Sequence, residues 1–357
     1  MRKIMIILLC ILCLCGTVRA AEEETLVDTS PLEEALPDGV NIGTVEGVEA
    51  ESFWDKAWDL LTTTFQKSKN TQKESLRLCA LLLCVVMLCA MVHMNSEKMG
   101  ATAVTAAGAL GLCGLCMGSF STLLTLASDT VREMTDYSAA ALPVLASTVA
   151  LNGGISASQT LYTGTVLFSQ VLMQLISKVL VPLVYFYLAV ATAEAAIGTD
   201  MLSELREFIG WVISKSLRIV IYIFLAYMSL TGVISGSSDA AAVKATKAAV
   251  SGMVPVVGGI ISDASETLLA SASMLKNTVG IFGMLAVIGI CIAPFLRIGV
   301  QYLLLKMTAA VSGTIGMKSH VQLLKHFSTA MGYLLAMCGS CALLLLIAGV
   351  CFLKVVV

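Results

Sequence analysis

The sequence predicts an all-α membrane protein with about seven helices across the bilayer, and six or eight spans also fit it. Hydrophobic residues make up 57% of the chain and charged residues only 13%, whereas a soluble domain carries about a quarter charged residues. The mean hydropathy is +0.90, and many segments are apolar around the whole helix. The net charge of −2, without a basic stripe, argues against a nucleic-acid partner and leaves the lipid bilayer as the surrounding medium.

Residues 1–20 have the pattern of a secretory signal peptide. Arg2 and Lys3 form a basic start, residues 4–15 form a short apolar core, and Val18-Arg19-Ala20 fits the small-residue cleavage pattern. An uncleaved anchor is the alternative. In both cases the signal predicts that the next segment lies outside the cytoplasm.

Residues 21–75 form an acidic exported segment. Thirteen of the 24 acidic residues lie between Glu22 and Glu74, and the first half is too polar to fold alone, so we expect a flexible tether there. From Ser52 onward, aromatic and apolar residues recur at helical spacing. They predict a short amphipathic helix, which would lie on the membrane surface or pack against the rest of the protein.

Residues 76–357 form the predicted membrane domain. A span needs roughly 20 apolar residues. Residues 161–197 are long enough for two spans, or for one long helix kinked at Pro182. The charged residues between 129 and 137 predict an interfacial loop or short helix, and the short apolar run 142–151 predicts a re-entrant piece. The other predicted spans are residues 78–94, 101–126, 208–234, 279–296 and 330–352.

The second span carries a stripe of glycines. At 100° per residue they occupy one face of the helix, which lets another helix approach closely. A gating hinge is the alternative to helix packing. The four residues are Gly108, Gly111, Gly114 and Gly118.

A second glycine-rich run interrupts the later part of the chain. Residues 254–261 are apolar but too short to cross a bilayer, Pro255 lacks a backbone donor, and Asp263 follows at once. Irregular backbone at membrane depth survives only inside protein or beside a water-filled cavity, so this run predicts a broken or re-entrant element. The candidate gate or partner-docking residues are Pro255, Gly258, Gly259, Asp263, Lys276 and Asn277.

Five charged residues lie at or near the expected membrane depth. Such residues are functional candidates by default, although ion pairing or snorkelling to the interface would also explain them. Glu194 is the only acid well inside an apolar stretch. The four basic residues are Lys178, Lys215, Arg218 and Arg297. A basic loop between Lys306 and Lys325 is the best cytoplasmic candidate.

The sequence lacks the usual motifs of an enzyme, a cofactor site or a metal site. It has no Gly-rich phosphate loop, no His-Glu-x-x-His and no nucleophile elbow. Nine cysteines follow the signal peptide, all in apolar stretches, so no disulfide framework is expected. The two Cys-x-x-Cys pairs, 113–116 and 338–341, fit helix packing better than redox or metal chemistry. We therefore expect no enzymatic activity and no cofactor.

One stretch resembles a known family, most specifically over residues 236–320. It looks like the core of the stage III sporulation protein AE family, whose members are multi-pass membrane proteins. The order of signal peptide, acidic segment and multi-span region also fits. The resemblance rests on Asp239, Lys244, Lys247, the run Val254-Pro-Val-Val-Gly-Gly259, Ser262-Asp263, Lys276-Asn277, Gly280, Pro294, Tyr302 and Lys306.

The resemblance implies a function. Proteins of this family are made in the mother cell and act in a complex that joins mother cell and forespore. The complex contains the other stage III A proteins and a forespore partner, works as a channel or secretion-like apparatus, and supports late forespore gene expression. The family has no established catalytic residues. The number of copies that assemble is left open, including a homo-oligomer.

Three hypotheses follow for the mechanism. The glycine-rich run could gate a polar path, or the protein could be a platform that assembles other subunits. A secondary transporter for a small solute is the third, because such proteins carry inverted repeats. Its support is a faint similarity between the Pro143…Gly153-Gly154 region and the Pro255…Gly258-Gly259 region.

Overall fold

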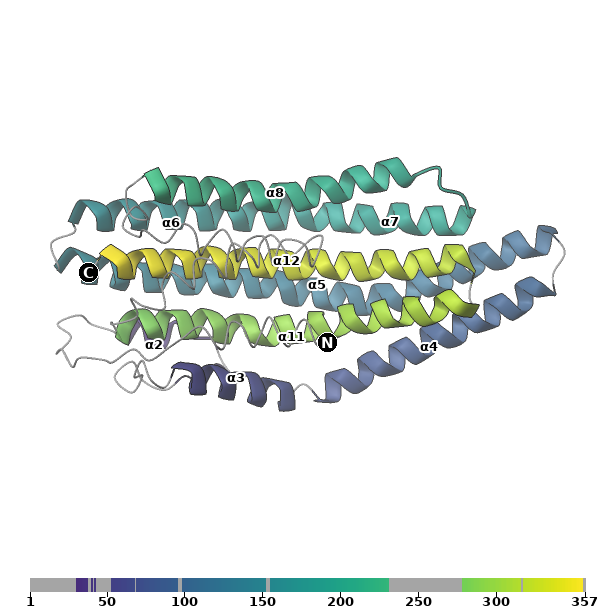
Figure 1. Ribbon diagram of the computed structural model, residues 1–357, viewed down its shortest axis with the longest axis horizontal. Coiled ribbons are helices and arrows are strands. Elements are labelled where there is room, and N and C mark those ends of the chain that lie inside the picture. Colours follow the sequence, from purple (N-terminus) through teal and green to yellow (C-terminus); the bar gives the residue numbers. More distant parts are fainter. Residues whose placement is uncertain are drawn as a thin grey trace, which may run out of the picture.

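The fold is a bundle of long helices that run lengthwise beside one another (Figure 1). The computed structural model describes residues 30–37, 40, 42, 53–67, 69–95, 98–151, 155–230, 278–315 and 317–355. Every regular element in this part of the chain is a helix, which confirms the all-α prediction. The predicted signal peptide, residues 1–20, lies outside the described residues.

Residues 21–75, the predicted exported segment, contribute two short helices, α2 (Ser30–Glu34) and α3 (Phe53–Lys67). α3 is the expected amphipathic helix, and it packs against α11 through partly buried residues that include Leu60. Gly289 of α11 makes room for this contact, because a Cβ atom there would lie 2.6 Å from Val40 and 3.9 Å from Leu60. The helix is therefore packed on the protein, which was one of its two predicted positions.

α4 (Lys69–Met94) and α5 (Lys98–Leu151) form the first long hairpin. α5 is an unbroken helix of 54 residues and is about 80 Å long at 1.5 Å per residue. Residues 129–137, predicted as an interfacial loop or short helix, and residues 142–151, predicted as a re-entrant piece, are instead parts of this one long helix. The charges instead form a helical i,i+4 ion pair, Arg132 Nε–Asp136 Oδ2 at 3.8 Å. Pro143 and Ala139, whose carbonyl has no N–H donor at Pro143, are both exposed residues of α5.

Residues 155–197 form one continuous helical path, which is the kinked-helix alternative. It consists of α6 (Ile155–Leu175), a π-helical turn η3 (Ile176–Leu180) and α7 (Val181–Ile197). Pro182 has no N–H for the carbonyl of Lys178, and the π-helical turn lies where this bond is missing. α8 (Ser203–Leu230) then runs back along α7.

The centre of the bundle is the hairpin of α11 (Thr278–Ile315) and α12 (Lys318–Val355). The most apolar windows of these two helices are 72% and 78% buried, against 22–39% for the other membrane-length helices. The predicted basic loop is mostly helix, since Lys306 lies in α11 and both Lys318 and Lys325 lie in α12.

Six described helices are long and apolar enough to cross a membrane, which is the lower end of the predicted six to eight. Several greatly exceed the length that one crossing needs. Their apolar parts are residues 72–94, 100–147, 159–197, 203–229, 279–314 and 318–352.

Candidate functional site between α7, α8 and α12

A tight turn brings the end of α7 against the start of α8. Gly198 ends α7 with a φ of 75°, a left-handed conformation that glycine adopts without strain. Its N–H donates to the carbonyl of Glu194 at 2.9 Å. The hydroxyl of Ser203 donates to the carbonyl of Asp200 at 2.8 Å, across the start of α8. This short connection therefore places the C-terminal end of α7 next to the N-terminal end of α8.

This turn forms a buried ion pair between Glu194 and Arg206. Arg206 Nε donates to Glu194 Oε2 at 2.8 Å, and the two side chains are only 14% and 8% exposed. Burying either charge alone would be unfavourable, so each holds the other in place. Glu194 Oε1 is also buried and has no hydrogen-bond partner among the described residues. The carboxylate can therefore accept one more donor.

An aromatic contact joins the same helices to α12. The Tyr187 hydroxyl lies 3.0 Å from His326 Nδ1, and the two rings meet edge to face at 5.9 Å. Tyr187 also packs edge to face on Tyr333, with ring centroids 5.5 Å apart. Arg206 lies close enough to the Tyr187 hydroxyl to interact with it electrostatically. We call Glu194, Arg206, Tyr187, His326 and Tyr333 the polar cluster.

Gly210 of α8 lets Tyr333 fit beneath it. A Cβ atom at this position would lie 2.5 Å from the Tyr333 hydroxyl and 3.8 Å from the Tyr187 ring. Both tyrosines are buried, so their rings have little room to move aside. Residue 210 is thus a close-approach position, and the sequence analysis did not single it out.

The chemistry of the polar cluster is that of a structural junction. Its groups are a carboxylate, a guanidinium, an imidazole and two phenols, which together donate and accept hydrogen bonds across three helices. In the part of the chain that the structure describes, no three His, Cys, Asp or Glu side chains gather into a metal site. The geometry therefore ties the α7–α8 hairpin to the central helix α12.

A second buried contact joins α12 to α5. His320 is fully buried, and its Nε2 lies 3.0 Å from the carbonyl of Thr105. Gly108 lies directly beneath this ring, because a Cβ atom there would approach His320 Cε1 to 2.5 Å and Cys89 Sγ to 2.8 Å. His320, which lies within the basic loop predicted from the sequence, is therefore part of the helical core.

The glycine stripe of α5 divides into one packed and three open positions. Gly108 packs against α12 as just described. A Cβ atom on any of the other three would have nothing within 4 Å, and all three are exposed. Among the described residues they pack against no other helix, so a packing role for them stays a prediction. These open residues are Gly111, Gly114 and Gly118.

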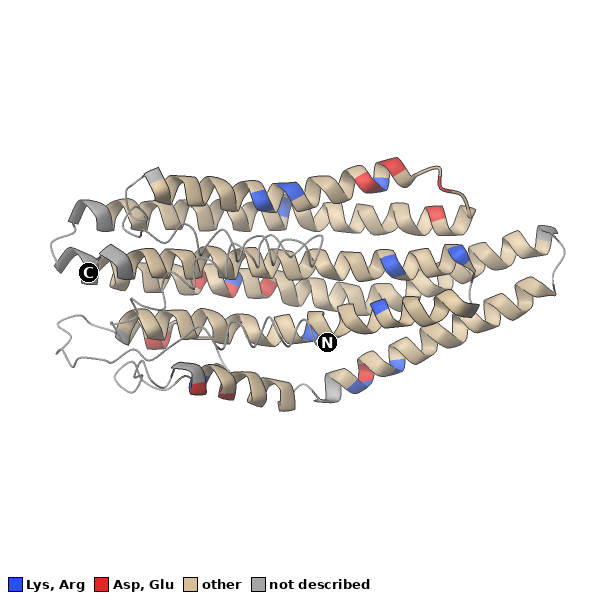
Figure 2. Ribbon diagram, in the orientation of Figure 1, with Lys and Arg blue, Asp and Glu red and all other residues tan. Residues whose placement is uncertain are grey.

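The other predicted charges lie apart from the polar cluster. Lys178 is exposed in η3, Lys215 is exposed on α8, and Arg297 is exposed on α11. Arg218 is half-buried on α8. Figure 2 marks charged residues of α5, of the middle of α8 and of α11 that lie farther from the α7–α8 turn than those at the start of α8. Of the five predicted charges, only Glu194 belongs to the polar cluster.

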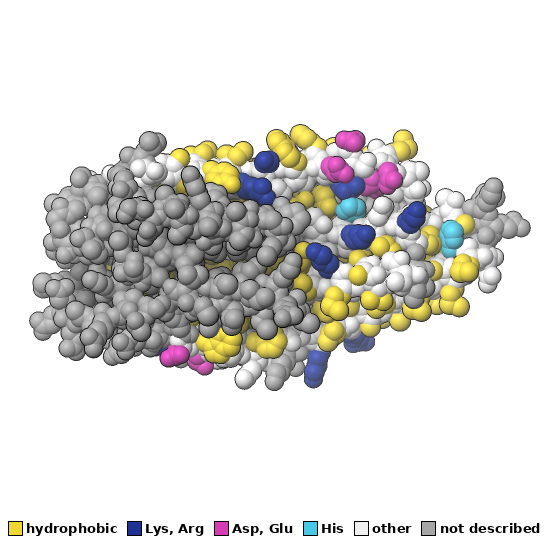
Figure 3. Space-filling model, viewed as in Figure 1, with side chains coloured by type: hydrophobic (Ala, Val, Ile, Leu, Met, Phe, Trp, Pro, Cys, Tyr) yellow, Lys and Arg dark blue, Asp and Glu magenta, His cyan; other side chains and the backbone are white. Residues whose placement is uncertain are grey.

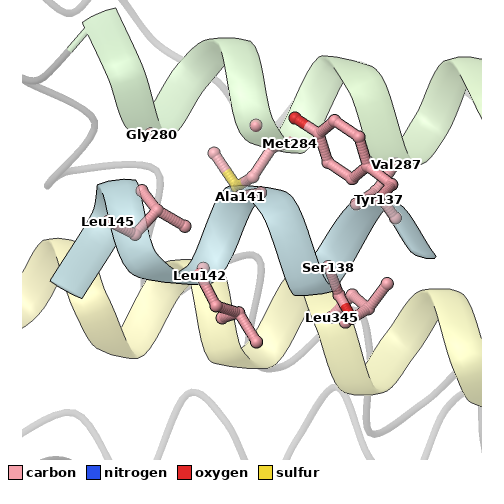
Figure 4. Close-up of a pocket in the computed structure, with 11 residues that line it drawn as sticks. Tyr137, Ser138, Ala141, Leu142, Leu145, Gly280, Met284, Val287 and Leu345 are labelled. Atoms are coloured by element: carbon pink, nitrogen blue, oxygen red, sulfur yellow. The ribbon is translucent and has the colours of Figure 1, made fainter. Parts of the chain in front are cut away.

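The predicted gate lies outside the described residues. This applies to Pro255, Gly258, Gly259, Asp263, Lys276 and Asn277. Among the described residues, a cavity of about 30 Å³ lies between α5, α11 and α12 and has room for about one water molecule. Tyr137 and Ala141 of α5 face Met284 and Gly280 of α11 there (Figure 4). The Tyr137 hydroxyl is buried without a described hydrogen-bond partner.

Replacing Tyr187 by phenylalanine should lower the free energy of unfolding by about 0.5–1.5 kcal/mol, the usual net value of one hydrogen bond. The change removes the hydroxyl that contacts His326 and leaves the ring packed edge to face on Tyr333. Thermal unfolding in detergent measures the difference. Tyr185→Phe, on an exposed ring of the same helix, is the control. Equal effects of the two changes would contradict a role for the hydroxyl.

Comparison with known proteins identifies the family. The family model of stage III sporulation protein AE matches residues 41–354. The stage III sporulation protein AE of Bacillus subtilis strain 168 is 26% identical over 207 residues, which is 57% of this chain and 51% of that protein. The chain thus aligns with about half the length of this relative. No solved structure matches it. The match to the family model covers almost every described helix, and the chain belongs to the stage III sporulation protein AE family.

Proposed function

We propose that this protein is a membrane subunit of the sporulation complex that links mother cell and forespore. It would sit in the mother-cell membrane that faces the forespore and be needed for late forespore gene expression. Its partners would be the other stage III A membrane proteins and a forespore channel partner. The observation that carries this proposal is the family match over residues 41–354, together with six membrane-length helices in the same region.

Within such a complex, the packing favours an assembly platform over a channel through one chain. The central helices α11 and α12 are the most buried helices, and their large core side chains include Phe282 and Phe327. The cavity next to Tyr137 holds about one water molecule. A conduit would therefore run between chains, with this protein as part of its wall. The polar cluster would keep the α7–α8 hairpin fixed on that wall.

Deletion of the gene in its spore-forming host tests the proposal. We expect loss of heat-resistant spores, restored by the wild-type gene, and capture of neighbouring stage III A proteins by a tagged copy. Normal sporulation in the deletion strain would contradict the proposal. Tyr185→Phe, on an exposed ring outside the polar cluster, is the control variant that should complement fully.

Two variants in the predicted gate distinguish an assembly platform from a conduit. If the predicted gate lines a polar path, Gly258→Val and Asp263→Ala should abolish sporulation while the partners are still captured. If the protein is only a platform, function and partner capture should fail together. The transporter alternative predicts an inverted repeat. Pro143 of its first half lies inside the continuous helix α5, and Gly153-Gly154 and Gly258-Gly259 lie outside the described residues.

A further inference from the structure

α5 has one open side that extends over much of its length. At about 100° per residue, the exposed residues on this side, most of them small, share one face of the helix. Phe120 points to the opposite side, where its ring packs edge to face on Phe327 of α12. The open side therefore faces away from the centre of the bundle. Its residues are Gly111, Gly114, Gly118, Thr122, Thr125 and Asp129.

The open side of α5 is a distinct surface of the molecule. It is turned away from the viewer in Figures 1 and 3, because α12 lies in front of α5 there. The face drawn in Figure 3 carries a group of Lys, Arg and His side chains, with Asp and Glu side chains beside them. The open side differs from that face, since residues 99–128 include no charged residue and the first charge is Asp129.

η3 and α7 present a second exposed side, which is bulkier. Its residues recur every three or four positions, and they include one cation at its start and one large ring near its middle. Phe186, the large ring, is 49% exposed. We call this surface the α7 side, and its residues are Lys178, Pro182, Phe186 and Ala189.

Two contacts within the chain fix the register of α5 against α7. The Thr192 hydroxyl donates to Cys113 Sγ at 3.3 Å. The rings of Tyr185 and Phe120 pack edge to face, with centroids 5.9 Å apart. Seven residues forward along α5 thus correspond to seven residues back along α7, so the two helices are antiparallel and each position has a defined level.

The two sides differ in bulk at one level. By this register, Phe186 of α7 is level with residue 119 of α5, next to Gly118. A Cβ atom at Gly118 would have nothing within 4 Å, so the backbone of α5 is open there. Small residues of this kind let a second helix approach closely in a membrane. The chain therefore presents a gap and a ring that could fill it at the same level but on different sides.

The two sides also differ in charge at a second level. Lys178 is level with residue 127, which is about 3 Å along the helix axis from Asp129. Both side chains are exposed, and neither belongs to an ion pair among the described residues. Both lie in apolar helices of membrane length, where charged side chains usually pair with an opposite charge. Each of them therefore needs a partner that the described chain does not supply.

The difference in charge extends beyond these two residues. Residues 129–136 of α5 include three acidic residues and one basic residue. Residues 159–190 and 208–229, on the helices around the α7 side, include no acidic residue. Their three basic residues are Lys178, Lys215 and Arg218. One chain thus has an acidic side and a basic side, and a second copy supplies the charge that each side lacks.

We propose that the open side of α5 binds the α7 side of a second copy of this chain, head to tail. Copies that insert in one orientation are related by a rotation about an axis along the bundle, so each level of one copy meets the same level of the next. Asp129 then pairs with the partner's Lys178, and the partner's Phe186 fills the gap at Gly118. A contact of this kind joins unlike surfaces, and repeated copies close into a ring when the rotation allows it.

A second copy explains these features better than a different protein does. A different partner would need only one of the two sides. This chain carries both members of two complementary pairs, the ring with the gap and the cation with the acid, and each pair matches in level. The occupant of the open side of α5 is therefore the same protein.

Charge reversal tests the pairing in the full-length protein. Two copies with different tags are expressed together, extracted in mild detergent, and the second copy is measured after capture of the first. Asp129→Lys in both copies, or Lys178→Asp in both, should lower co-capture at least about tenfold, because like charges then face each other. Asp59→Lys, at an exposed acid of α3, is the matched control and should leave co-capture unchanged.

Mixing the two single variants is the decisive measurement. A tagged Asp129→Lys copy and a differently tagged Lys178→Asp copy should capture each other to within about twofold of wild type, because opposite charges again face each other between the copies. Such rescue cannot come from pairing within one chain or from misfolded variants. Absence of co-capture for the wild-type chain would overturn the proposal. Single variants that associate like wild type, or a mixture that stays dissociated, would overturn it as well.

A photo-crosslinker identifies what covers the gap in native membranes. p-Benzoylphenylalanine at position 186 should crosslink to the peptide that contains residues 111–122 of another copy, which isotopic labelling of one copy distinguishes from a crosslink within the chain. The same group at position 208, where Phe208 of α8 is 60% exposed, is the control and should not reach that peptide. Crosslinks from position 186 only to a different protein, or only to lipid, would overturn a second copy as the occupant.

Discussion

Arg206→Met should lower the free energy of unfolding by about 3–5 kcal/mol, the largest effect that we expect from a single change. The side chain of methionine fills similar space but leaves the Glu194 carboxylate buried without its cation. Among the described residues, Glu194 Oε1 already lacks a hydrogen-bond partner, so no second donor is in place there to compensate for the lost guanidinium. Chemical or thermal unfolding of the purified protein in detergent measures the loss.

The double variant Glu194→Leu with Arg206→Met distinguishes the effect of the ion pair from the effect of side-chain volume. An apolar pair of similar size is often as stable as a buried ion pair, so the double variant should recover most of the lost stability. Lys215→Met removes an exposed charge from the same helix and should change stability by less than about 0.5 kcal/mol. A single variant no less stable than wild type would show that the ion pair does not hold α7 and α8 together.

Gly108→Val should destabilise the protein by about 3 kcal/mol, at the upper end of the usual cost of overpacking a core. The new side chain would displace the buried His320 ring and Cys89, both of which lie under 3 Å from the added Cβ position. It would also disturb the contact between His320 Nε2 and the Thr105 carbonyl. Thermal unfolding in detergent measures the shift.

Gly114→Val is the matched control on the same helix and in the same stripe. Nothing lies within 4 Å of a Cβ atom there, so the change should be close to neutral in the purified single chain. A loss at residue 114 equal to that at residue 108 would contradict the distinction between packed and open glycines. A loss at 114 that appears only in the assembled complex would point to a partner helix on the open part of the stripe.

The sequence predicted most of the fold because composition and helical periodicity report burial directly. It failed where charge was taken as a sign of a loop. The four charges between residues 129 and 136 lie on the exposed side of a helix, and the Arg132–Asp136 pair at i,i+4 is a helical signal that was available. His320 was also misplaced. Its basic neighbours suggested a loop, but its side chain is fully buried.

The polar cluster could be predicted only in part. Glu194 was identified because it is an acid within an apolar run. Its partner Arg206 precedes the apolar span in the sequence, and only the left-handed Gly198 and the short turn bring the two side chains together. Tyr187 and His326 are 139 residues apart, and no local pattern reports such a contact.

The central position of α11 and α12 has a consequence for biosynthesis. Translation makes the outer helices first, and 125 residues separate the end of α8 from the end of α12. At a translation rate of about 5–20 residues per second, roughly 6–25 s pass between synthesis of the outer helices and synthesis of the hairpin that completes their core. During that interval Tyr187 of α7 has no His326 to contact, and Gly108 of α5 has no His320 above it. A nascent chain stalled before residue 278 would therefore be a natural substrate for insertion chaperones and membrane proteases.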